Sequence, residues 1–204
     1  MAKDVIIIGA GGHAKVVADI VLCSGDNLIG FLDDNIKLDE VVYKDYKVVG
    51  KISDSMEYRD KYFNIAIGDN HIRAKIAEKY DALAWYTAIH PKTVIADTVK
   101  IGKGTVVMAG AVINPDSYIV EHCIINTSCS IDHDNNIGNY VHVSPGANLV
   151  GTVSVGNYSW ICVGATVINN VSVASDVIVG AGGVVTRDID ESGTYVGVPV
   201  RKVR

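Results

Sequence analysis

Two stretches of the sequence hold residue types that can do chemistry on a polar substrate. In the segment IDHD, His133 lies between Asp132 and Asp134. A carboxylate beside an imidazole orients the ring and stabilises its protonated form, which suits a general base. Near the N-terminus, GAGGHA runs from Gly9 to Ala14, between an apolar run and an amphipathic run. A glycine turn between a strand and a helix presents backbone amides to phosphate, so this stretch predicts a phosphate site.

Spacing alone leaves more than one ligand open for the glycine turn. Gly9, Gly11 and Ala14 fit the pattern G-x-G-x-x-A, and Asp33 follows where a dinucleotide-binding domain keeps a ribose-binding acid. A dinucleotide needs two mononucleotide-binding halves of parallel sheet, whereas the pattern of the chain changes at residue 89. We therefore expect the diphosphate of a nucleotide-linked sugar at this turn. NAD and a purely structural turn are the alternatives.

The elements that position the turn alternate between strand and helix over residues 1–88. This order predicts a small Rossmann-like α/β domain with a parallel sheet. Segment 34–56 is polar and has no clear pattern. The expected strands are Val5–Ile8, Leu28–Leu32 and Asn64–Ile67, and the expected helices are Gly12–Cys23 and Asn70–Tyr80.

The second half of the chain, residues 89–204, has a different period. From Ile89 to Val185 an aliphatic residue recurs every six positions, seventeen times without a break, and a small residue usually follows four positions later. Neither an α-helix nor an alternating strand has a period of six. The repeat predicts a parallel β-helix in which three hexapeptides make one coil. Residues eighteen apart should therefore stack, His133 beside Gly151 and His142 between Ile124 and Trp160.

Composition restricts the partners. A net charge of −5 argues against nucleic acid, because phosphate binding needs a basic face. We find no apolar run of membrane-spanning length and no signal-peptide features, and therefore expect a cytoplasmic protein without a membrane partner. The cysteines form no C-x-x-C pair and are expected to be reduced. Cys123 and Cys129 occupy small-residue positions of the repeat, which indicates core packing rather than redox chemistry.

Several motifs together resemble one family of enzymes. The uninterrupted hexapeptide repeat resembles the left-handed β-helix acyltransferases, and the N-terminal GAGGH unit narrows the resemblance. Together they resemble the bacterial nucleotide-amino-sugar N-acetyltransferases, including the UDP-sugar enzymes of bacillosamine synthesis and the GDP-perosamine enzymes. Sialic-acid O-acetyltransferases are similar too. The matching segments are GAGGHAKVV, GFLDD, AIGDNHIR, NTSCSIDHD, VHVSPGA and YVGVPVRKV.

The resemblance implies a site with three sets of residues. It implies that His133 is the base, that Asn126 lies near the reacting groups, and that acetyl-CoA lies between β-helices of a homotrimer. The bacillosamine enzymes carry a glutamate in place of Asp132, which leaves open whether Asp132 or Asp134 orients the ring. The expected sugar-nucleotide contacts are Gly11, Gly12, His13, Asp33, Asp34 and Gly68. The expected acetyl-CoA contacts are His142, Gly151, Val163, Gly164, Gly180 and Ala181, where turn geometry is the other interpretation of Gly164 and Gly180.

Three histidines also permit a metal hypothesis, because β-helix carbonic anhydrases bind zinc through three histidines. That family uses a closely spaced H-x4-H pair, whereas His122, His133 and His142 are separated by eleven and nine residues. Zinc needs ligands that converge on one point. We therefore expect no metal.

The function expected from these observations is an acetyl-CoA-dependent N-acetyltransferase. Its substrate would be the amino group of a nucleotide-linked 4-amino-4,6-dideoxy sugar, with UDP as the expected nucleotide. The acetyl group would pass directly to the amine, with His133 as general base. The alternatives are an O-acetyltransferase acting on sialic acid or a related sugar, and a non-catalytic scaffold that binds a sugar nucleotide.

Overall fold

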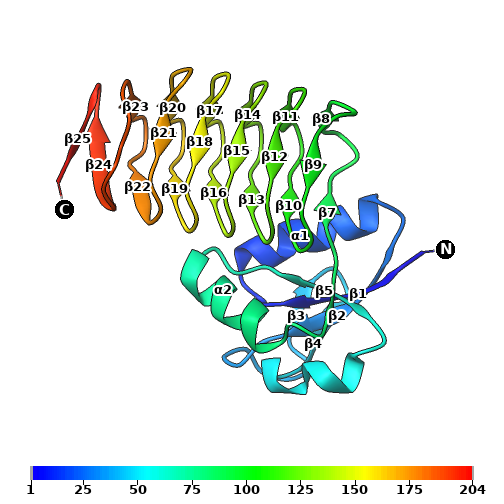
Figure 1. Cartoon of the computed structure of the whole chain (residues 1–204). Helices are drawn as coiled ribbons and strands as arrows, with labels where there is room; N and C mark the ends of the chain where they lie inside the picture. Colours follow the sequence, from blue (N-terminus) through cyan, green and yellow to red (C-terminus); the bar gives the residue numbers. More distant parts are fainter. Residues whose placement is uncertain (1, 204) are drawn as a thin grey trace.

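The N-terminal part of the chain is a six-stranded sheet flanked by helices. The structure is a computed structural model that describes residues 2–203 (Figure 1). The sheet has the order β3-β4-β2-β1-β5-β6 and is parallel except for the β3–β4 pair. Its strands are β1 (Asp4–Ile8), β2 (Asn27–Leu32), β3 (Val41–Tyr43), β4 (Tyr46–Gly50), β5 (Tyr62–Ile65) and β6 (Ala84–Trp85). The helices are α1 (Gly12–Cys23), α2 (Asn70–Lys79) and the 3-10 helix η1 (Ile52–Tyr58).

The central strands are apolar because both faces of the parallel sheet are covered. Residues 5–8 of β1 are fully buried, and α1 and α2 pack their small and aliphatic residues against the sheet. Helix α1 has the predicted bounds, and β5 lies two residues before the predicted strand. The hairpin β3–β4 and most of η1 lie in segment 34–56, which has no clear pattern in the sequence. The edge strand β3 shows no apolar alternation because none of its residues is fully buried, and Val41 is exposed.

The C-terminal part is a three-faced parallel β-helix, as the period of six predicts. The first face, toward the α/β part in Figure 1, holds β7 (Ala88–Ile89), β10 (Val106–Val107), β13 (Ile124–Ile125), β16 (His142–Val143), β19 (Trp160–Ile161) and β22 (Val177–Val179). It continues into β24 (Gly193–Gly197) and β25 (Val200–Lys202). The second face holds β8 (Val94–Ile95), β11 (Val112–Ile113), β14 (Ser130–Ile131), β17 (Asn148–Leu149), β20 (Thr166–Val167) and β23 (Val184–Val185). The third face holds β9 (Lys100–Ile101), β12 (Tyr118–Ile119), β15 (Asn136–Ile137), β18 (Ser154–Val155) and β21 (Ser172–Val173).

The aliphatic repeat forms the core of these coils. From Val107 to Val185 each repeat residue is buried, and the earlier three pack against the same core. Stacking follows the predicted eighteen-residue register, with Ile124 beside His142 and His142 beside Trp160. Cys123 and Cys129 are buried in this core, as predicted, and burial raises the pKa of each thiol to about 12.

The two parts share an apolar junction. Helix α1 packs against the first face, and Val106 and Met108 of the β-helix belong to the same apolar cluster as Val17 of α1. Asn64 donates from Nδ2 to the carbonyl oxygens of Tyr86 and Gly104. No helix within residues 2–203 combines the length and apolar character needed to cross a bilayer.

Candidate functional site

The glycine turn leaves open space at the start of α1. Gly9 has φ 102°, and a Cβ there would lie 3.0 Å from the carbonyl oxygen of Ala66, so only glycine fits. Gly11 precedes the helix without a side-chain cap, and a Cβ added at Gly11 or Gly12 would meet nothing within 4 Å. The first amides of α1 therefore lie beside free space. Such amides suit a phosphate oxygen.

Asp33 holds this turn in place. Its Oδ2 accepts a hydrogen bond from the amide of Ala10 at 2.8 Å. Its Oδ1 accepts from the amides of Asn35 at 2.8 Å and Ile36 at 3.1 Å. The carboxylate thus joins the end of β2 to the glycine turn. Asp34 makes a similar link, because its Oδ1 accepts from the amide of Ile52 at 3.0 Å.

A cleft of about 540 Å³ lies beside these two acids. Its wall combines the acids with apolar side chains of α2 and of the residues on either side of that helix, including Ile67, Ile72 and Tyr80. Apolar walls with a few polar groups are typical of small-molecule sites. The cleft suits the base and ribose of a nucleotide.

A second cavity, of about 250 Å³, lies between the glycine turn and the first face of the β-helix. Gly12, His13 and Gly68 line it from one side, and Asn126 and His142 line it from the other. The structure therefore brings together three of the expected site residues from the N-terminal half with two from the repeat. The full lining of the cavity is Gly12, His13, Val16, Gly68, Met108, Ile124, Asn126, Thr127 and His142.

Hydrogen bonds fix the tautomer of His142. The side-chain oxygen of Asn126 accepts from the amide of Thr127 at 2.8 Å, so its Nδ2 faces His142 Nε2 at 3.1 Å. Nε2 is therefore an acceptor, and the ring hydrogen lies on Nδ1. Within the described residues, His142 Nδ1 and His13 Nε2 are buried without a hydrogen-bond partner. Such orphaned polar atoms are costly, and a polar ligand in the cavity would satisfy them.

Both histidines are neutral at physiological pH. Burial, with the nearby positive charge of Arg73 as a second cause, lowers the pKa of His13 to about 4. Burial and Arg73 likewise lower the pKa of His142 to about 3. These rings can exchange hydrogen bonds with a substrate, but they carry no charge of their own.

Arg73 is a residue of this site that sequence reasoning missed. It is 1% exposed on α2, and within residues 2–203 no carboxylate lies at hydrogen-bond distance from its guanidinium. Its guanidinium donates to the carbonyl oxygens of His122 at 2.7 Å and Tyr140 at 2.8 Å, both in the β-helix. It also donates to the carbonyl oxygen of Gly68 at 3.3 Å. The available signal was an arginine placed on the apolar side of α2, beside Ala74.

His133 lies at the corner between the second and third faces. Its Nδ1 lies 2.7 Å from Asp134 Oδ2. The Asp132 carboxylate instead accepts from the backbone amide of His133 at 2.9 Å and from Asn114 Nδ2 at 2.7 Å. Of the two acids that the sequence left open, Asp134 is therefore the one that contacts the ring. This hydrogen bond raises the pKa of His133.

The predicted catalytic and acetyl-CoA residues lie at different corners and faces of the three-sided β-helix. In a three-sided prism, the corner that carries His133 is opposite the first face, which carries His142. One chain therefore does not bring these two histidines together. Gly151 lies at the His133 corner, one coil further on, whereas Val163, Gly164 and Ala181 lie at the corner between the first and second faces, with Gly180 directly before Ala181. Gly164 has φ 64°, a turn conformation that favours glycine.

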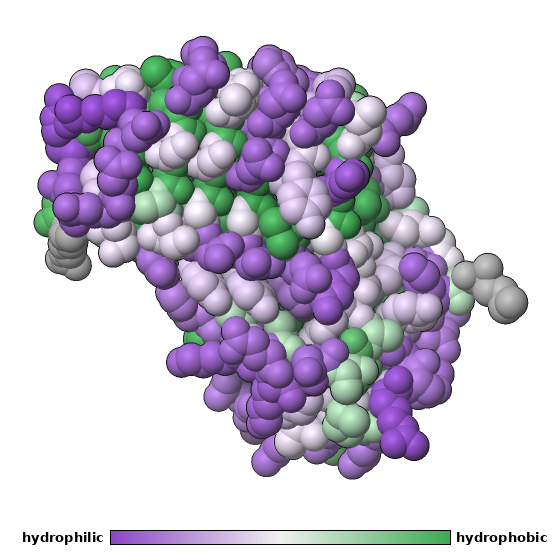
Figure 2. Space-filling view, viewed as in Figure 1, coloured by the Kyte–Doolittle hydropathy of each residue, from purple (hydrophilic) through white to green (hydrophobic). Residues whose placement is uncertain are grey.

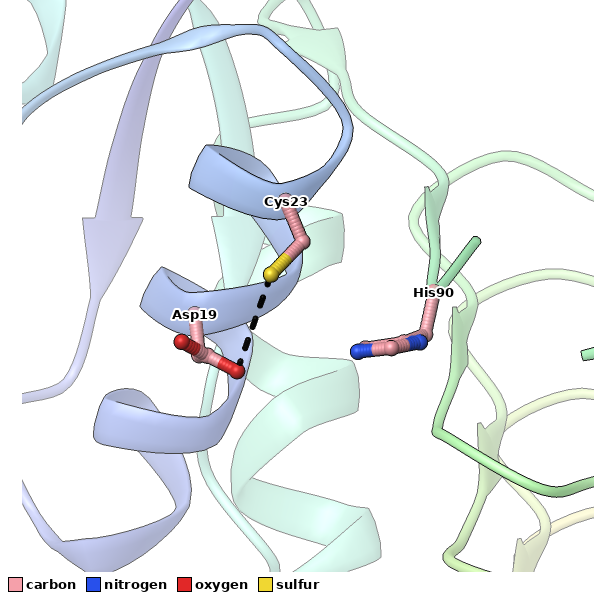
Figure 3. A group of neighbouring side chains, drawn as sticks. All are labelled: Asp19, Cys23 and His90. Carbon is pink, nitrogen blue, oxygen red and sulfur yellow. Dashed lines mark hydrogen bonds between the residues drawn. The ribbon is translucent and has the colours of Figure 1, made fainter. Parts of the chain in front are cut away.

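Two groups of side chains test the metal hypothesis. His122 lies at the corner between the third and first faces, so the three histidines of the sequence-based hypothesis do not converge. Within residues 2–203, Asp19, Cys23 and His90 offer ligand atoms within 4.8 Å of one another (Figure 3). His90 Nδ1 accepts from the amide of Lys92 at 2.9 Å, so Nε2 carries the ring hydrogen and cannot bind a metal in that tautomer. This group does not fit a metal ion.

Comparison with known proteins places this geometry in a family. Residues 4–80 match the PglD N-terminal domain. The chain is similar to PerB from Caulobacter crescentus, solved with CoA and GDP-perosamine, with 39% identity, a TM-score of 0.92, and coverage of 98% of this chain and 97% of that one. It is also similar to the acetyltransferase domain of PglB from Neisseria gonorrhoeae FA1090, solved with acetyl coenzyme A, with 33% identity, a TM-score of 0.93 and full coverage of both chains.

The chain is also similar to curated protein sequences, over shorter spans. UDP-N-acetylbacillosamine N-acetyltransferase of Bacillus subtilis (strain 168) is 39% identical over 112 residues, which are 52% of each chain. The matched region is 24% of the length of an uncharacterised protein of Acanthamoeba polyphaga mimivirus that is 37% identical over 121 residues. The chain thus spans about half or less of these two relatives. Its likeness to PerB and PglB over nearly the whole of all three chains shows that it belongs to the family of nucleotide-amino-sugar N-acetyltransferases built on a left-handed β-helix.

Proposed function

We propose that the protein transfers the acetyl group of acetyl-CoA to the amine of a nucleotide-linked 4-amino-4,6-dideoxy sugar. The observation that carries the proposal is the His133–Asp134 pair at a β-helix corner, in a chain that aligns over 98% of its length with PerB. The relatives include one named for a UDP sugar and one named for a GDP sugar. The expected UDP substrate and its GDP counterpart are therefore separate arms of the test.

The α/β part holds the nucleotide. The open amides at Gly11 and Gly12 bind the diphosphate, and the cleft beside Asp33 and Asp34 takes the base and ribose. The sugar then extends into the cavity between His13 and His142, where the two orphaned ring nitrogens find hydrogen-bond partners. Neutral imidazoles suit a sugar with hydroxyl and amine groups, because they can donate to one group and accept from another.

His133 acts as the general base. As the sugar amine forms its bond to the thioester carbonyl carbon, His133 Nε2 takes a proton from the nitrogen. The carbonyl is then restored, the C–S bond breaks, and the CoA thiolate leaves. Asp134 stabilises the imidazolium through the 2.7 Å contact with Nδ1. Direct transfer needs no enzyme nucleophile, and the buried Cys123 and Cys129 are poor ones because burial raises the pKa of each to about 12.

The separation of the two histidines on one chain is the reason to propose a homotrimer. His133 of one subunit meets the cavity of its neighbour when the two β-helices lie side by side. Acetyl-CoA then lies between the corner that carries His133 and the facing corner of the neighbour, near Val163, Gly164, Gly180 and Ala181. Figure 2 shows apolar surface among polar side chains along the coils, and Val94, Val163 and Trp160 are exposed by 65, 50 and 39%. Large exposed apolar residues on a β-helix favour association.

The test is an acetyl-transfer assay on a panel of 4-amino sugars linked to UDP, GDP and dTDP, with sialic acid added as the O-acetylation arm. Release of CoA thiol gives the rate, and mass spectrometry of the product gives the acetylated position. We expect one nucleotide-linked amino sugar to be acetylated on nitrogen. Transfer to sialic acid alone, or binding of sugar nucleotides without any transfer, would replace the proposal by the O-acetyltransferase or the scaffold.

A further inference from the structure

We propose that Gly151 is a positioning residue for His133, because its missing side chain leaves the space that the imidazole occupies. The inference rests on the proposed role of His133 as base. The sequence suggested Gly151 as a stacking neighbour of His133 and as an acetyl-CoA contact, but not as a residue that positions the ring. The residue that supports the His133 ring therefore belongs to the next coil of the β-helix.

The imidazole lies directly on Gly151. A Cβ built on Gly151 would lie 2.5 Å from His133 Cε1 and 2.6 Å from Nε2. Carbon atoms in contact are normally separated by about 3.5–4.0 Å. The backbone of Gly151 is not in the left-handed region, so other residues can adopt its conformation. Space for the ring, rather than backbone freedom, is therefore what requires glycine here.

The two coils cannot move apart to make room. The amide of Thr152 donates to the carbonyl oxygen of His133 at 2.9 Å. The buried Asn135 donates from Nδ2 to the carbonyl oxygens of Asp132 at 2.6 Å and Val150 at 3.1 Å, which joins the same coils again. A side chain at position 151 would therefore displace the imidazole and not the backbone.

Displacement of the ring affects its orientation more than it affects folding. The His133 side chain is 57% exposed, so the ring can swing outward without disturbing the core. The swing would lengthen the 2.7 Å contact between Nδ1 and Asp134 and move Nε2 away from the substrate. A misplacement of about 1 Å in a catalytic group costs on the order of 10²-fold in rate. We expect Gly151→Ala to lower kcat by about that factor and to leave the KM for acetyl-CoA unchanged.

The experiment compares Gly151→Ala with the wild type in the full chain. It measures kcat, the KM for acetyl-CoA, and the titration of the His133 ring by carbon-13 NMR of labelled histidine. The pKa of His133 should fall toward its ordinary value in the variant, because the contact with Asp134 lengthens. Asn169→Ala, an exposed position one coil further along the same corner, is the control and should change none of the three quantities.

A double variant separates positioning from contact with the coenzyme. In a His133→Ala background there is no ring to displace, so adding Gly151→Ala should leave the residual kcat unchanged. A further drop in kcat there, or a single variant that raises only the KM for acetyl-CoA, would overturn the proposal. An unchanged His133 titration in Gly151→Ala would also overturn it. That titration needs no substrate, so it gives a result even if the proposed acetyl transfer fails.

Discussion

Replacing His122 should make the protein less sensitive to acid. His122 is 1% exposed between Trp85 and Tyr140, and its Nδ1 is buried without a partner. Burial, followed by the charges of Arg73 and Lys103, lowers the pKa of His122 from 6.5 to about 4. A histidine with a depressed folded-state pKa leaves the free energy of unfolding unchanged well above pH 6.5 and lowers it progressively as the pH falls from 6.5 toward 4.

The size of the effect follows from these two pKa values. At pH 8 the ring is neutral in the folded and the unfolded chain, so it adds nothing to the free energy of unfolding. At pH 5 the His122 ring is mostly protonated in the unfolded chain and mostly neutral in the folded chain. This difference lowers the free energy of unfolding by about 2 kcal/mol. His13 and His142 add losses of the same sign, so the wild type should lose more than this.

The variant to measure is His122→Asn. His122 has φ 55°, and asparagine tolerates this left-handed conformation. Urea unfolding at pH 8 and pH 5, at one protein concentration, gives the free energy of unfolding at each pH. The substitution also loses packing contacts, but this free-energy cost is the same at both pH values and cancels in the difference. We expect the loss between pH 8 and pH 5 to be smaller in His122→Asn than in the wild type by about 2 kcal/mol.

The control is Ile161→Val, a substitution in the β-helix core that removes no titratable group. This variant should lower the free energy of unfolding equally at both pH values, and so keep the wild-type difference between them. Equal acid losses in His122→Asn and the wild type would refute the reasoning, because His122 would then take up its proton as readily folded as unfolded.

Two further variants test the proposed site. Asp134→Asn should move the acid limb of the pH–rate profile to lower pH. Asp134 raises the pKa of His133, and a general base works only when it is unprotonated, so loss of the carboxylate should let His133 act at lower pH. An acid limb that does not shift would show that Asp134 does not control the pKa of the catalytic base. Asp33→Asn should weaken sugar-nucleotide binding by about 10-fold or more, since the Ala10 amide loses its charged acceptor, and calorimetry should give an unchanged affinity for acetyl-CoA. An equal loss of both affinities would indicate a folding defect.

The repeat made the β-helix predictable because the constraint is local and periodic. Each coil needs one inward aliphatic residue in six, so the inward position could be assigned from Ile89 to Val185 without knowing the fold around it. The same arithmetic gave the stacking of His142 on Trp160. The bounds of helix α1 were also predictable, because the glycine turn marks its start and the amphipathic run marks its extent.

Features that depend on contacts between distant segments were not predictable. The role of Arg73 depends on carbonyl oxygens of His122 and Tyr140 that only the folded junction brings near it. The choice between Asp132 and Asp134 depends on side-chain rotamers at one corner, and both acids flank His133 equally in sequence. The hairpin β3–β4 was missed because it lies at the edge of its sheet, where half-exposed strands leave no apolar pattern.

The central claim is that His133 is the base for acetyl transfer. The most direct measurement is the kcat of His133→Ala on the nucleotide-linked amino sugar that the wild type acetylates, with sedimentation of both proteins to compare their assembly. We expect kcat to fall by about 10²–10⁴-fold, while the assembly state of the wild type and the binding of both substrates are retained. A His133→Ala protein that assembles normally and turns over at the wild-type rate would contradict the mechanism.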